Sequence, residues 1–334
     1  MNKPNEGTLM KQRSHLACLS AGYKLYTSNF KAIFTSSWIS AILYSLACGA
    51  LGVISLFEMP RFTLMILANN NPESPFYTSP EFITFTAIFL SVIILGGLFE
   101  VLFYSCNISL LQKHSETSCI PAPAKWYRID TSAFWRMFKA CFFTGCVALI
   151  AYIIFALIHI AIIYCFKASD ISPVTIARYN IIGSCLISLL VVFLILPFNY
   201  IIMRYMINTS DSFWQSIFRK YSTATRHYGQ IFSVNLLNAI IYTLCSMIIS
   251  IPAIILSFAN STATTGHLYG DPLGMPTYIV PLTAVVFVVI GFIQIYLRAT
   301  FIFPAYYIYG SIETYEAERE KDRMKWTENN DSTN

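Results

Sequence analysis

Six long apolar runs limit what this chain can become more than any other feature of its sequence. They cover about 36–57, 82–108, 138–165, 179–206, 230–257 and 279–308. A helix needs about 20 mostly apolar residues to cross a bilayer, and each run approaches or exceeds that length. Lipid offers no partners to backbone N–H and C=O groups, so helices are the expected form. We therefore predict an all-α membrane protein with six transmembrane helices.

Composition agrees with this class. Charged residues make up 12% of the chain and hydrophobic residues 56%, whereas soluble domains carry about 25% charged residues. The formal net charge of +5 is no sign of nucleic-acid binding, because the basic residues flank apolar runs and form no compact face. Residues 1–34 show no cleavable signal peptide, so we expect the first run to insert as an uncleaved anchor. The expected partners are membrane lipids and other membrane proteins, not nucleic acid.

Lys and Arg residues predict the orientation. Eighteen of the 22 lie in the N-terminal segment, in the links after the second and fourth runs, and in the tail. The opposite loops hold only Arg61, Lys167 and Arg178. Because short cytoplasmic loops are rich in Lys and Arg, both termini are predicted to be cytoplasmic, with the chain crossing the plasma membrane, the inner membrane of a bacterium, several times. It then divides into a cytoplasmic segment (1–35), a transmembrane domain (36–310) and a charged cytoplasmic tail (311–334).

Other signals concern loops and prolines. The outer segments 69–81 and 259–276 are rich in Asn, Pro, Gly, Ser and Thr, which predicts irregular loops. Pro197, Pro252 and Pro304 fall within the fourth, fifth and sixth runs. Such prolines remove a helical hydrogen bond and kink the helix. They either open a cavity or shape the packing of neighbouring helices, and packing is the favoured interpretation.

The chain also contains an internal repeat. When residues 26–46 are set against residues 224–244, a shift of 198, seven of the 21 positions are identical, Tyr44 and Tyr242 among them. The same shift carries the second run onto the sixth without a gap and places Glu100 on Arg298. Residues 132–143 enter the third run in a similar way. We therefore predict three hairpins that start from the cytoplasm as parallel repeats, unlike the inverted repeats of many transporters.

An amphipathic stretch precedes two of these hairpins. Apolar residues recur every three or four positions between 19 and 33, and again between 213 and 221, with basic residues beside them. Helices of this kind suit the cytoplasmic headgroup plane. The alternative is that the two stretches extend the spans and pack against other helices.

Two segments resemble a known family. Residues 212–241, SFWQSIFRKYSTATRHYGQIFSVNLLNAII, resemble the segment before a late span in a broad bacterial six-helix family. Its best-named members are the membrane domains attached to glycerophosphodiester phosphodiesterases. Residues 297–310, LRATFIFPAYYIYG, with Pro304 near the inner end, are similar to the family's last helix. The phosphodiesterase barrel and its acidic metal site have no counterpart in the sequence, so the resemblance implies the six-helix fold without the hydrolase activity.

Glu100 and Arg298 are the candidate intramembrane ion pair. Glu100 lies 19 residues after Glu81, or about 28 Å along a helix, which places it in the inner half of the membrane. One hypothesis pairs it with Arg298 across the second and sixth spans, so that the first hairpin is fastened to the third. A second hypothesis lets each side chain reach water or headgroups independently. A third is a proton or anion relay, which no chain of further ionisable residues supports.

Further polar residues are sparse. His159, Asn199 and Gln294 are candidates for the lining of a polar cavity, and a bond from His159 to a neighbouring helix carbonyl is the more ordinary interpretation. Nine cysteines occur without CxxC spacing, which favours small apolar fillers over metal or redox chemistry. The sequence contains no catalytic motif that we recognise, so we predict no enzyme, no cofactor and no metal.

The leading hypothesis is thus a non-enzymatic membrane protein that organises lipid or assists other envelope components. The alternative is a transporter or channel for a small or lipid-like molecule. A lipid-filled groove between hairpins would favour the first. A water-filled cavity lined by Glu100, Arg298, Asn199 and Gln294 would favour the second. A membrane-embedded enzyme ranks third, because it needs two or more polar groups that converge on His159.

Overall fold

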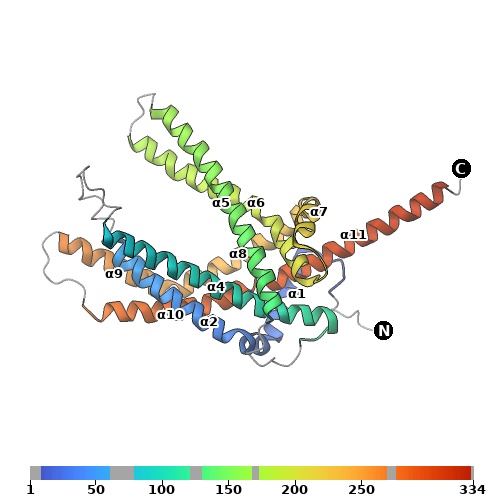
Figure 1. The fold of residues 1–334 in the computed structure, drawn as a ribbon, viewed down its shortest axis with the longest axis horizontal. Coiled ribbons are helices and arrows are strands. Elements are labelled where there is room, and N and C mark those ends of the chain that lie inside the picture. The colour runs from blue at the N-terminus through green and yellow to red at the C-terminus, as the bar shows by residue number, and fades with distance from the viewer. Residues whose placement is uncertain (1–8, 61–78, 121–129, 168–172, 269–275, 332–334) are drawn as a thin grey trace.

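The computed structural model describes residues 9–60, 79–120, 130–167, 173–268 and 276–331. This part of the chain is helical and contains no strand, so the predicted all-α class is confirmed (Figure 1). Six helical stretches are long and apolar enough to cross a membrane: Phe30–Glu58, Pro80–Thr117, Thr131–Ile162, Arg178–Ile207, Tyr228–Ile249 and Ile279–Thr327. Each overlaps one of the six predicted runs, and the protein is a multi-pass membrane protein.

The helices follow one another with short breaks. The first half of the chain forms α1 (His15–Ser28), α2 (Phe30–Val53), the π-helical η1 (Ile54–Glu58), α4 (Pro80–Thr117) and α5 (Thr131–Lys167). The second half forms α6 (Pro173–Ile207), α7 (Phe213–Arg226), α8 (Tyr228–Ile249), α9 (Ile251–Leu268), α10 (Ile279–Ala299) and α11 (Ile302–Asp331). α1 and α7 begin 198 residues apart, and so do α2 and α8. The shift that aligns the sequence therefore also aligns these helix boundaries.

A proline divides the sixth predicted run. Pro304 has no N–H, and its ring crowds the carbonyl of Thr300, four residues earlier. α10 accordingly ends at Ala299 and α11 starts at Ile302. The carbonyl oxygen of Thr300 accepts a hydrogen bond from Asn238 Nδ2 of α8 at 3.3 Å, and Tyr23 of α1 donates to Asn238 Oδ1 at 2.6 Å. The expected span 279–308 is thus two helices, joined by a turn that α1 and α8 bind.

The other two prolines lie inside α6 and at the start of α9. Pro197 lies inside α6, and the carbonyl of Phe193, four residues earlier, accepts from the hydroxyl of Tyr228 at 3.2 Å. Pro252 lies at the second position of α9, so the fifth run, expected to continue to residue 257, breaks at Ser250. The packing interpretation describes Pro197 and Pro304, since a side chain of α8 binds each carbonyl that the proline ring displaces.

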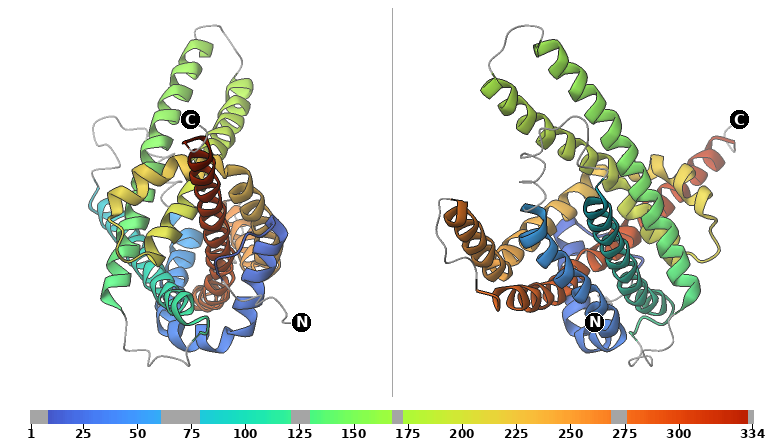
Figure 2. Two further views of the ribbon diagram at one scale, coloured as in Figure 1. Left: turned by 90° about the vertical axis from the view of Figure 1, so that its right-hand side faces the viewer. Right: turned by 60° about the vertical axis from the view of Figure 1, so that its left-hand side comes forward.

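The first turns of α11 form the centre of the protein. Side chains from Phe303 to Ile312 are buried all round the helix, and Figure 2 shows α11 passing between the surrounding helices. A helix that is buried on every face belongs to a protein interior. The predicted boundary between membrane domain and tail, at residue 310, therefore falls inside a packed helix.

The first amphipathic stretch packs against this centre. α1 buries Cys18, Leu19, Gly22, Leu25 and Tyr26, and its residues join α11 in one hydrophobic cluster. The alternative of packing against other helices therefore describes α1. α7 differs, because Trp214 and Phe218 on its surface are 56% and 73% exposed.

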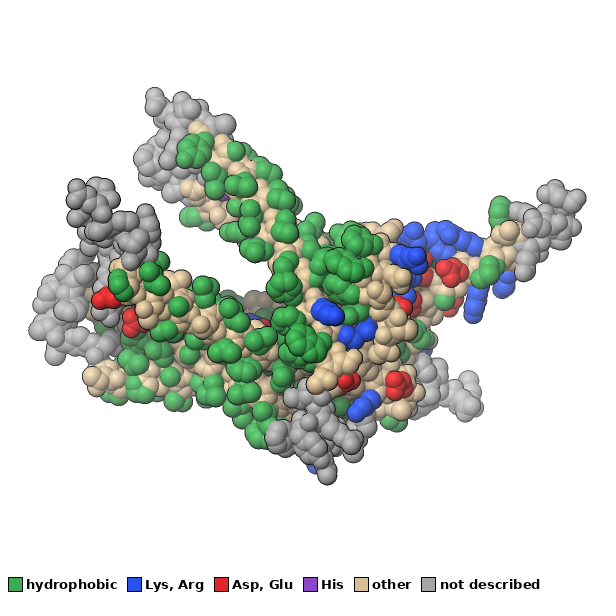
Figure 3. All heavy atoms as spheres, viewed as in Figure 1, with side chains coloured by type: hydrophobic (Ala, Val, Ile, Leu, Met, Phe, Trp, Pro, Cys, Tyr) green, Lys and Arg blue, Asp and Glu red, His purple; other side chains and the backbone are tan. Residues whose placement is uncertain are grey.

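The α5–α6 hairpin diverges from the other spans (Figures 1 and 2). At the end of the hairpin that holds the start of α5 and the end of α6, these helices pack against α4 through a cluster of Val101, Ile108, Met137, Ala140 and Met206. Beyond that level, large apolar side chains of both helices are exposed, from residue 149 to 164 in α5 and from 181 to 194 in α6. The space-filling view shows this apolar surface facing an open gap (Figure 3).

One outer segment departs from expectation. Residues 259–268 continue α9 as helix, although their composition predicts an irregular loop. Asn260 is 8% exposed and donates from Nδ2 to the carbonyl of Leu56 at 2.6 Å. This bond fastens α9 to η1. Most of the other predicted loop, 69–81, lies outside the described residues.

The contact between α1 and α11 generates a prediction. A Cβ at Gly22 would lie 2.5 Å from the backbone nitrogen of Pro304, and a backbone atom of a packed turn has no room to move. We expect Gly22→Ala to lower the free energy of unfolding by about 1–3 kcal/mol. The measurement is thermal unfolding of the purified protein in a neutral detergent.

Gly145→Ala is the matched control, because a Cβ at Gly145 of α5 meets no atom within 4 Å. Relief of backbone entropy predicts that this control raises stability by about 0.5–1 kcal/mol. Equal unfolding temperatures for Gly22→Ala and the wild type would contradict the close packing of α1 on Pro304.

Candidate functional site

Glu100 and Arg298 meet between α4 and α10. Glu100 lies in the middle of α4 and Arg298 in the last turn of α10. Arg298 Nη1 is 3.1 Å from Glu100 Oε1. Of the three hypotheses for these residues, the geometry is that of the ion pair. The pair joins the first and the last of the predicted hairpins, from which α4 and α10 come.

Three tyrosines complete the site. Arg298 Nη1 also donates to the hydroxyl of Tyr44 on α2 at 3.1 Å, and Nε donates to the hydroxyl of Tyr242 on α8 at 3.2 Å. Tyr104, one turn after Glu100, donates its hydroxyl hydrogen to Glu100 Oε1 at 2.9 Å. Four helices therefore contribute to one polar cluster, which we call the tyrosine cluster: Tyr44, Glu100, Tyr104, Tyr242 and Arg298.

Sequence reasoning missed the tyrosines, although one signal pointed to them. Tyr44 and Tyr242 are identical residues under the shift of 198 that also relates Glu100 to Arg298. In the structure both hydroxyls bind the same guanidinium. Tyr104 had no such signal, because a tyrosine one turn from a glutamate is ordinary in a chain with 16% aromatic residues.

The tyrosine cluster carries no net charge, and its two charged side chains are partly exposed. The opposite charges of Glu100 and Arg298 cancel, which lowers the cost of holding either at membrane depth. The Arg298 side chain is 36% exposed and the Glu100 side chain 27%. Arg298 Nη2 and Glu100 Oε2 make no hydrogen bond with any residue that the structure describes. A donor and an acceptor of opposite charge thus remain available to an outside molecule.

The gap between α4 and the α5–α6 hairpin begins at the level of the tyrosine cluster. Tyr104 packs against the cluster of α4, α5 and α6 residues that joins these helices, and Glu100 lies one turn further from the charged end. Gly97, another turn on, would have no atom within 4 Å of an added Cβ. Glu100 therefore lies one turn beyond the level at which α4, α5 and α6 pack together.

The other predicted site residues lie apart from the pair. Gln294, one turn before Arg298 on α10, donates from Nε2 to the hydroxyls of Ser250 at 3.0 Å and Ser246 at 3.2 Å. Asn199 of α6 donates from Nδ2 to Asn235 Oδ1 of α8 at 2.7 Å. Gln294 extends the polar side of α10 toward α8, whereas Asn199 belongs to a separate contact between α6 and α8.

His159 lies furthest from the pair along its hairpin. Its ring packs on Gly183 of α6, where a Cβ would be 2.0 Å from His159 Cε1. Nε2 is buried and has no hydrogen-bond partner among the described residues. His159 therefore serves the close approach of α5 and α6, and Gly183 provides the space for the ring.

A cavity of about 340 Å³ opens along α6. Val192, Ile195, Leu196, Asn199 and Ile202 line it from α6, with Thr144 of α5 opposite. All but Thr144 and Asn199 are apolar, and spacings of three and four place the α6 residues on one face of that helix. The cavity suits an acyl chain better than a hydrated solute.

Chemistry of metal or redox type finds no support in the described ranges. They contain no group of three His, Cys, Asp or Glu side chains placed to hold a metal ion. The eight cysteines whose side chains the structure describes are free thiols. Burial raises the pKa of the Cys18 thiol above its ordinary value, which keeps it neutral and unreactive.

Comparison with protein-family models, with curated proteins and with solved structures finds no match to this chain. The functional argument therefore depends on the geometry of the chain itself.

The ion pair generates a prediction about stability. Arg298→Leu leaves the Glu100 carboxylate without its cation, and we expect the free energy of unfolding to fall by about 1–3 kcal/mol. Glu100→Leu combined with Arg298→Leu removes both charges and should recover part of that loss. Thermal unfolding in detergent and the yield of folded protein measure both effects.

Arg219→Leu is the control for loss of one positive charge, because Arg219 lies exposed on α7. An Arg298→Leu protein that folds and unfolds like this control would show that the pair contributes nothing to stability.

Proposed function

We propose that this chain is a non-enzymatic protein of the plasma membrane that organises lipid by holding acyl chains in the gap between the α5–α6 hairpin and α4. The observation that carries the proposal is the apolar wall of this gap. Large aliphatic side chains on the outer halves of α5 and α6 are about half or more exposed, as Leu157 at 61% and Ile181 at 67% illustrate. In a membrane, surfaces of this kind are covered by lipid tails.

The shape of the gap favours lipid over a second protein surface. Its walls are two helix pairs that separate progressively from a packed base (Figure 1). A wedge of this form accepts flexible chains, whereas close helix association in membranes favours small residues along the contact. The aliphatic side chains that protrude from α5 and α6 do not fit that pattern.

Arrangement and sidedness form part of the proposal. We infer three parallel hairpins, α2–α4, α5–α6 and α8–α10, with α7 at the cytoplasmic headgroup level and the termini in the cytoplasm. Equal helix boundaries 198 residues apart support the repeat. Lys and Arg side chains gather at the end that carries α7 and α11 (Figure 3). The resemblance to the six-helix family is a proposal of the same kind and agrees with this arrangement.

A transporter or channel is the second candidate. One observation favours it: Arg298 Nη2 and Glu100 Oε2 make no hydrogen bond with a described residue, and both side chains are partly exposed. A polar solute that enters from the membrane would meet these atoms. The two candidates differ in what the purified protein retains, which is phospholipid in the first and a polar solute in the second.

We infer that the cavity on α6 is part of this lipid site, and filling it tests the proposal. Ile195→Trp places a large ring among the lining residues, and we expect it to lose at least half of the phospholipid that the wild type retains. Native mass spectrometry of protein purified in mild detergent counts the bound lipids.

Ile248→Trp is the control, since Ile248 is an exposed apolar residue of α8 that neither belongs to the α5–α6 hairpin nor lines the cavity. Equal phospholipid retention in the two variants would exclude the cavity as a lipid site. Retention of a polar solute without phospholipid would favour the transporter.

The proposed orientation predicts which side of the membrane exposes Cys119. This exposed thiol follows α4 at its basic end. A membrane-impermeant maleimide should label it in inverted inner-membrane vesicles and not in intact cells. The Cys119→Ser variant gives the background from other cysteines. Labelling of Cys119 in intact cells, above that background, would reverse the orientation.

A further inference from the structure

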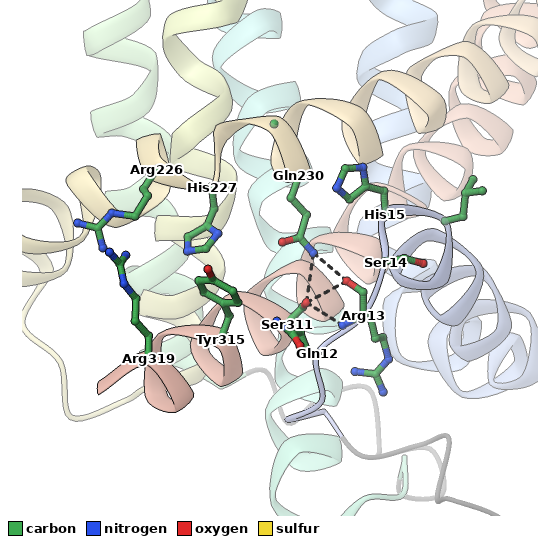
Figure 4. Close-up of a pocket in the computed structure, with 12 residues that line it drawn as sticks. Gln12, Arg13, Ser14, His15, Arg226, His227, Gln230, Ser311, Tyr315 and Arg319 are labelled. Atoms are coloured by element: carbon green, nitrogen blue, oxygen red, sulfur yellow. Dashed lines mark hydrogen bonds between the residues drawn. The ribbon is translucent and has the colours of Figure 1, made fainter. Parts of the chain in front are cut away.

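A second cavity lies at the charged end of the protein, far from the lipid gap. It is an open pocket of about 1130 Å³. Three segments enclose it: residues 12–16 at the start of α1, the junction of α7 and α8 at 226–230, and α11 from Ser311 to Arg319 (Figure 4). We call it the basic pocket, because Arg13, Arg226 and Arg319 line it together with His15 and His227.

The wall of the basic pocket beside Arg13 is held in place by hydrogen bonds. The backbone N–H of Arg13 donates to Ser311 Oγ at 3.0 Å. Gln230 Nε2 donates to the carbonyl of Arg13 at 3.3 Å and to Ser311 Oγ at 3.2 Å. These bonds, dashed in Figure 4, tie the chain before α1 to both α8 and α11. The pocket is therefore preformed by residues far apart in sequence.

The opposite side of the pocket concentrates positive charge. Arg226 and Arg319 extend toward one another from α7 and α11 (Figure 4). Glu316 is already bound, at 2.8 Å by His227 Nε2 and at 3.3 Å by Arg226 Nη1. Arg319 forms no ion pair with a described residue. Two guanidinium groups that line one pocket repel each other, and an anion between them would convert that repulsion into charge-assisted hydrogen bonds.

Backbone donors add to this charge. α8 begins at Tyr228, and the N–H groups of Tyr228 and Gly229 have no acceptor within the helix, whereas the N–H of Gln230 donates to the carbonyl of His227 at 3.1 Å. Gly229, which lines the pocket, has nothing within 4 Å of the position of a Cβ. A ligand can therefore come close to the backbone of this turn, where the helix dipole also favours negative charge.

We propose that the basic pocket binds a phosphate group. Arginine pairs two N–H donors with two phosphate oxygens, and a phosphate offers further oxygens to the first turn of α8. Arg226 and Arg319 bind the anion directly. Arg13 adds charge, while its own Nη1 donates to the carbonyls of Leu9 and Lys11. The phosphate belongs either to the headgroup of an anionic phospholipid or to a soluble phosphate compound. This proposal is independent of lipid binding in the gap.

The test uses the full chain in a neutral detergent. Thermal unfolding is followed while inorganic pyrophosphate is added, and in a parallel series with short-chain phosphatidylglycerol. Short-chain phosphatidylcholine is the reference for the second series, because it carries the phosphate without the net negative charge. We expect a rise in unfolding temperature with one of the two anionic probes.

The two converging arginines should be responsible for that rise. Arg226→Gln combined with Arg319→Gln is expected to weaken the apparent affinity at least tenfold. The control combines Arg219→Gln and Arg323→Gln, which remove the same charge from the same two helices outside the pocket. The control should match the wild type within about twofold, since long-range attraction alone is screened by salt.

A second variant separates binding from folding. Gly229→Asp places a carboxylate in the open space of the first turn, where an acidic residue favours the helix. This variant should fold at least as well as the wild type and lose the response to both anionic probes.

The outcomes are distinct. A response to pyrophosphate assigns the site to soluble phosphate compounds, and a response to phosphatidylglycerol alone assigns it to a headgroup. The proposal is overturned if neither probe raises the unfolding temperature, or if the control loses affinity as much as the pocket variant.

Discussion

A backbone carbonyl that loses its helical partner inside a membrane finds none in the lipid, and this constraint explains the position of α8. Pro304 and Pro197 each displace one carbonyl, that of Thr300 and that of Phe193. Asn238 and Tyr228, both on α8, bind these two carbonyls. α8 therefore binds the carbonyls that these two prolines leave without a helical partner, one in α6 and one between α10 and α11. The break at Thr300 in turn directs α11 into the centre, where Phe303 to Ile312 are buried.

The ion pair is the second constraint, and it acts between hairpins. Glu100 and Arg298 neutralise each other, but a guanidinium has more donors than one carboxylate oxygen can accept. Tyr44 and Tyr242 accept two of the remaining bonds from helices on either side. Under the proposed repeat these tyrosines are equivalent positions, and so are Glu100 and Arg298. The cluster then lies near the axis that relates the first hairpin to the third, where equivalent residues can meet.

How far the sequence predicts the structure depends on the range of the interactions. The six spans follow from runs of apolar residues, because each run meets the demand of the membrane locally. The proximity of Glu100 and Arg298 could be proposed because a shift of 198 gives them one depth. The break at Thr300 was expected only as a kink at Pro304, since the binding of its carbonyl by Asn238 depends on a contact 62 residues away.

Composition also conceals contacts between segments that are far apart in the sequence. Residues 259–268 have the residue types of a loop, yet the amide of Asn260 binds the carbonyl of Leu56 across 204 residues. The pattern from 19 to 33 predicts one amphipathic helix, whereas α1 ends at Ser28 and residues 30–33 begin α2. Periodicity alone also does not distinguish headgroups from α11 as the partner of the apolar face of α1. The basic pocket needs three segments, and no stretch of the chain carries its pattern.

The α5–α6 hairpin is bound at one end only, which gives the gap its form. Arg136 of α5 donates to the carbonyls of Asn208 at 2.9 Å and Thr209 at 3.0 Å, and its guanidinium lies 4.0 Å from the ring centre of Tyr205. Arg204 and Tyr200 of α6 both bind Glu313 of α11. These charge-assisted bonds lie at the inner end, where α11 is buried. The outer halves of α5 and α6 pack chiefly on each other, so their remaining apolar surface needs lipid as its solvent.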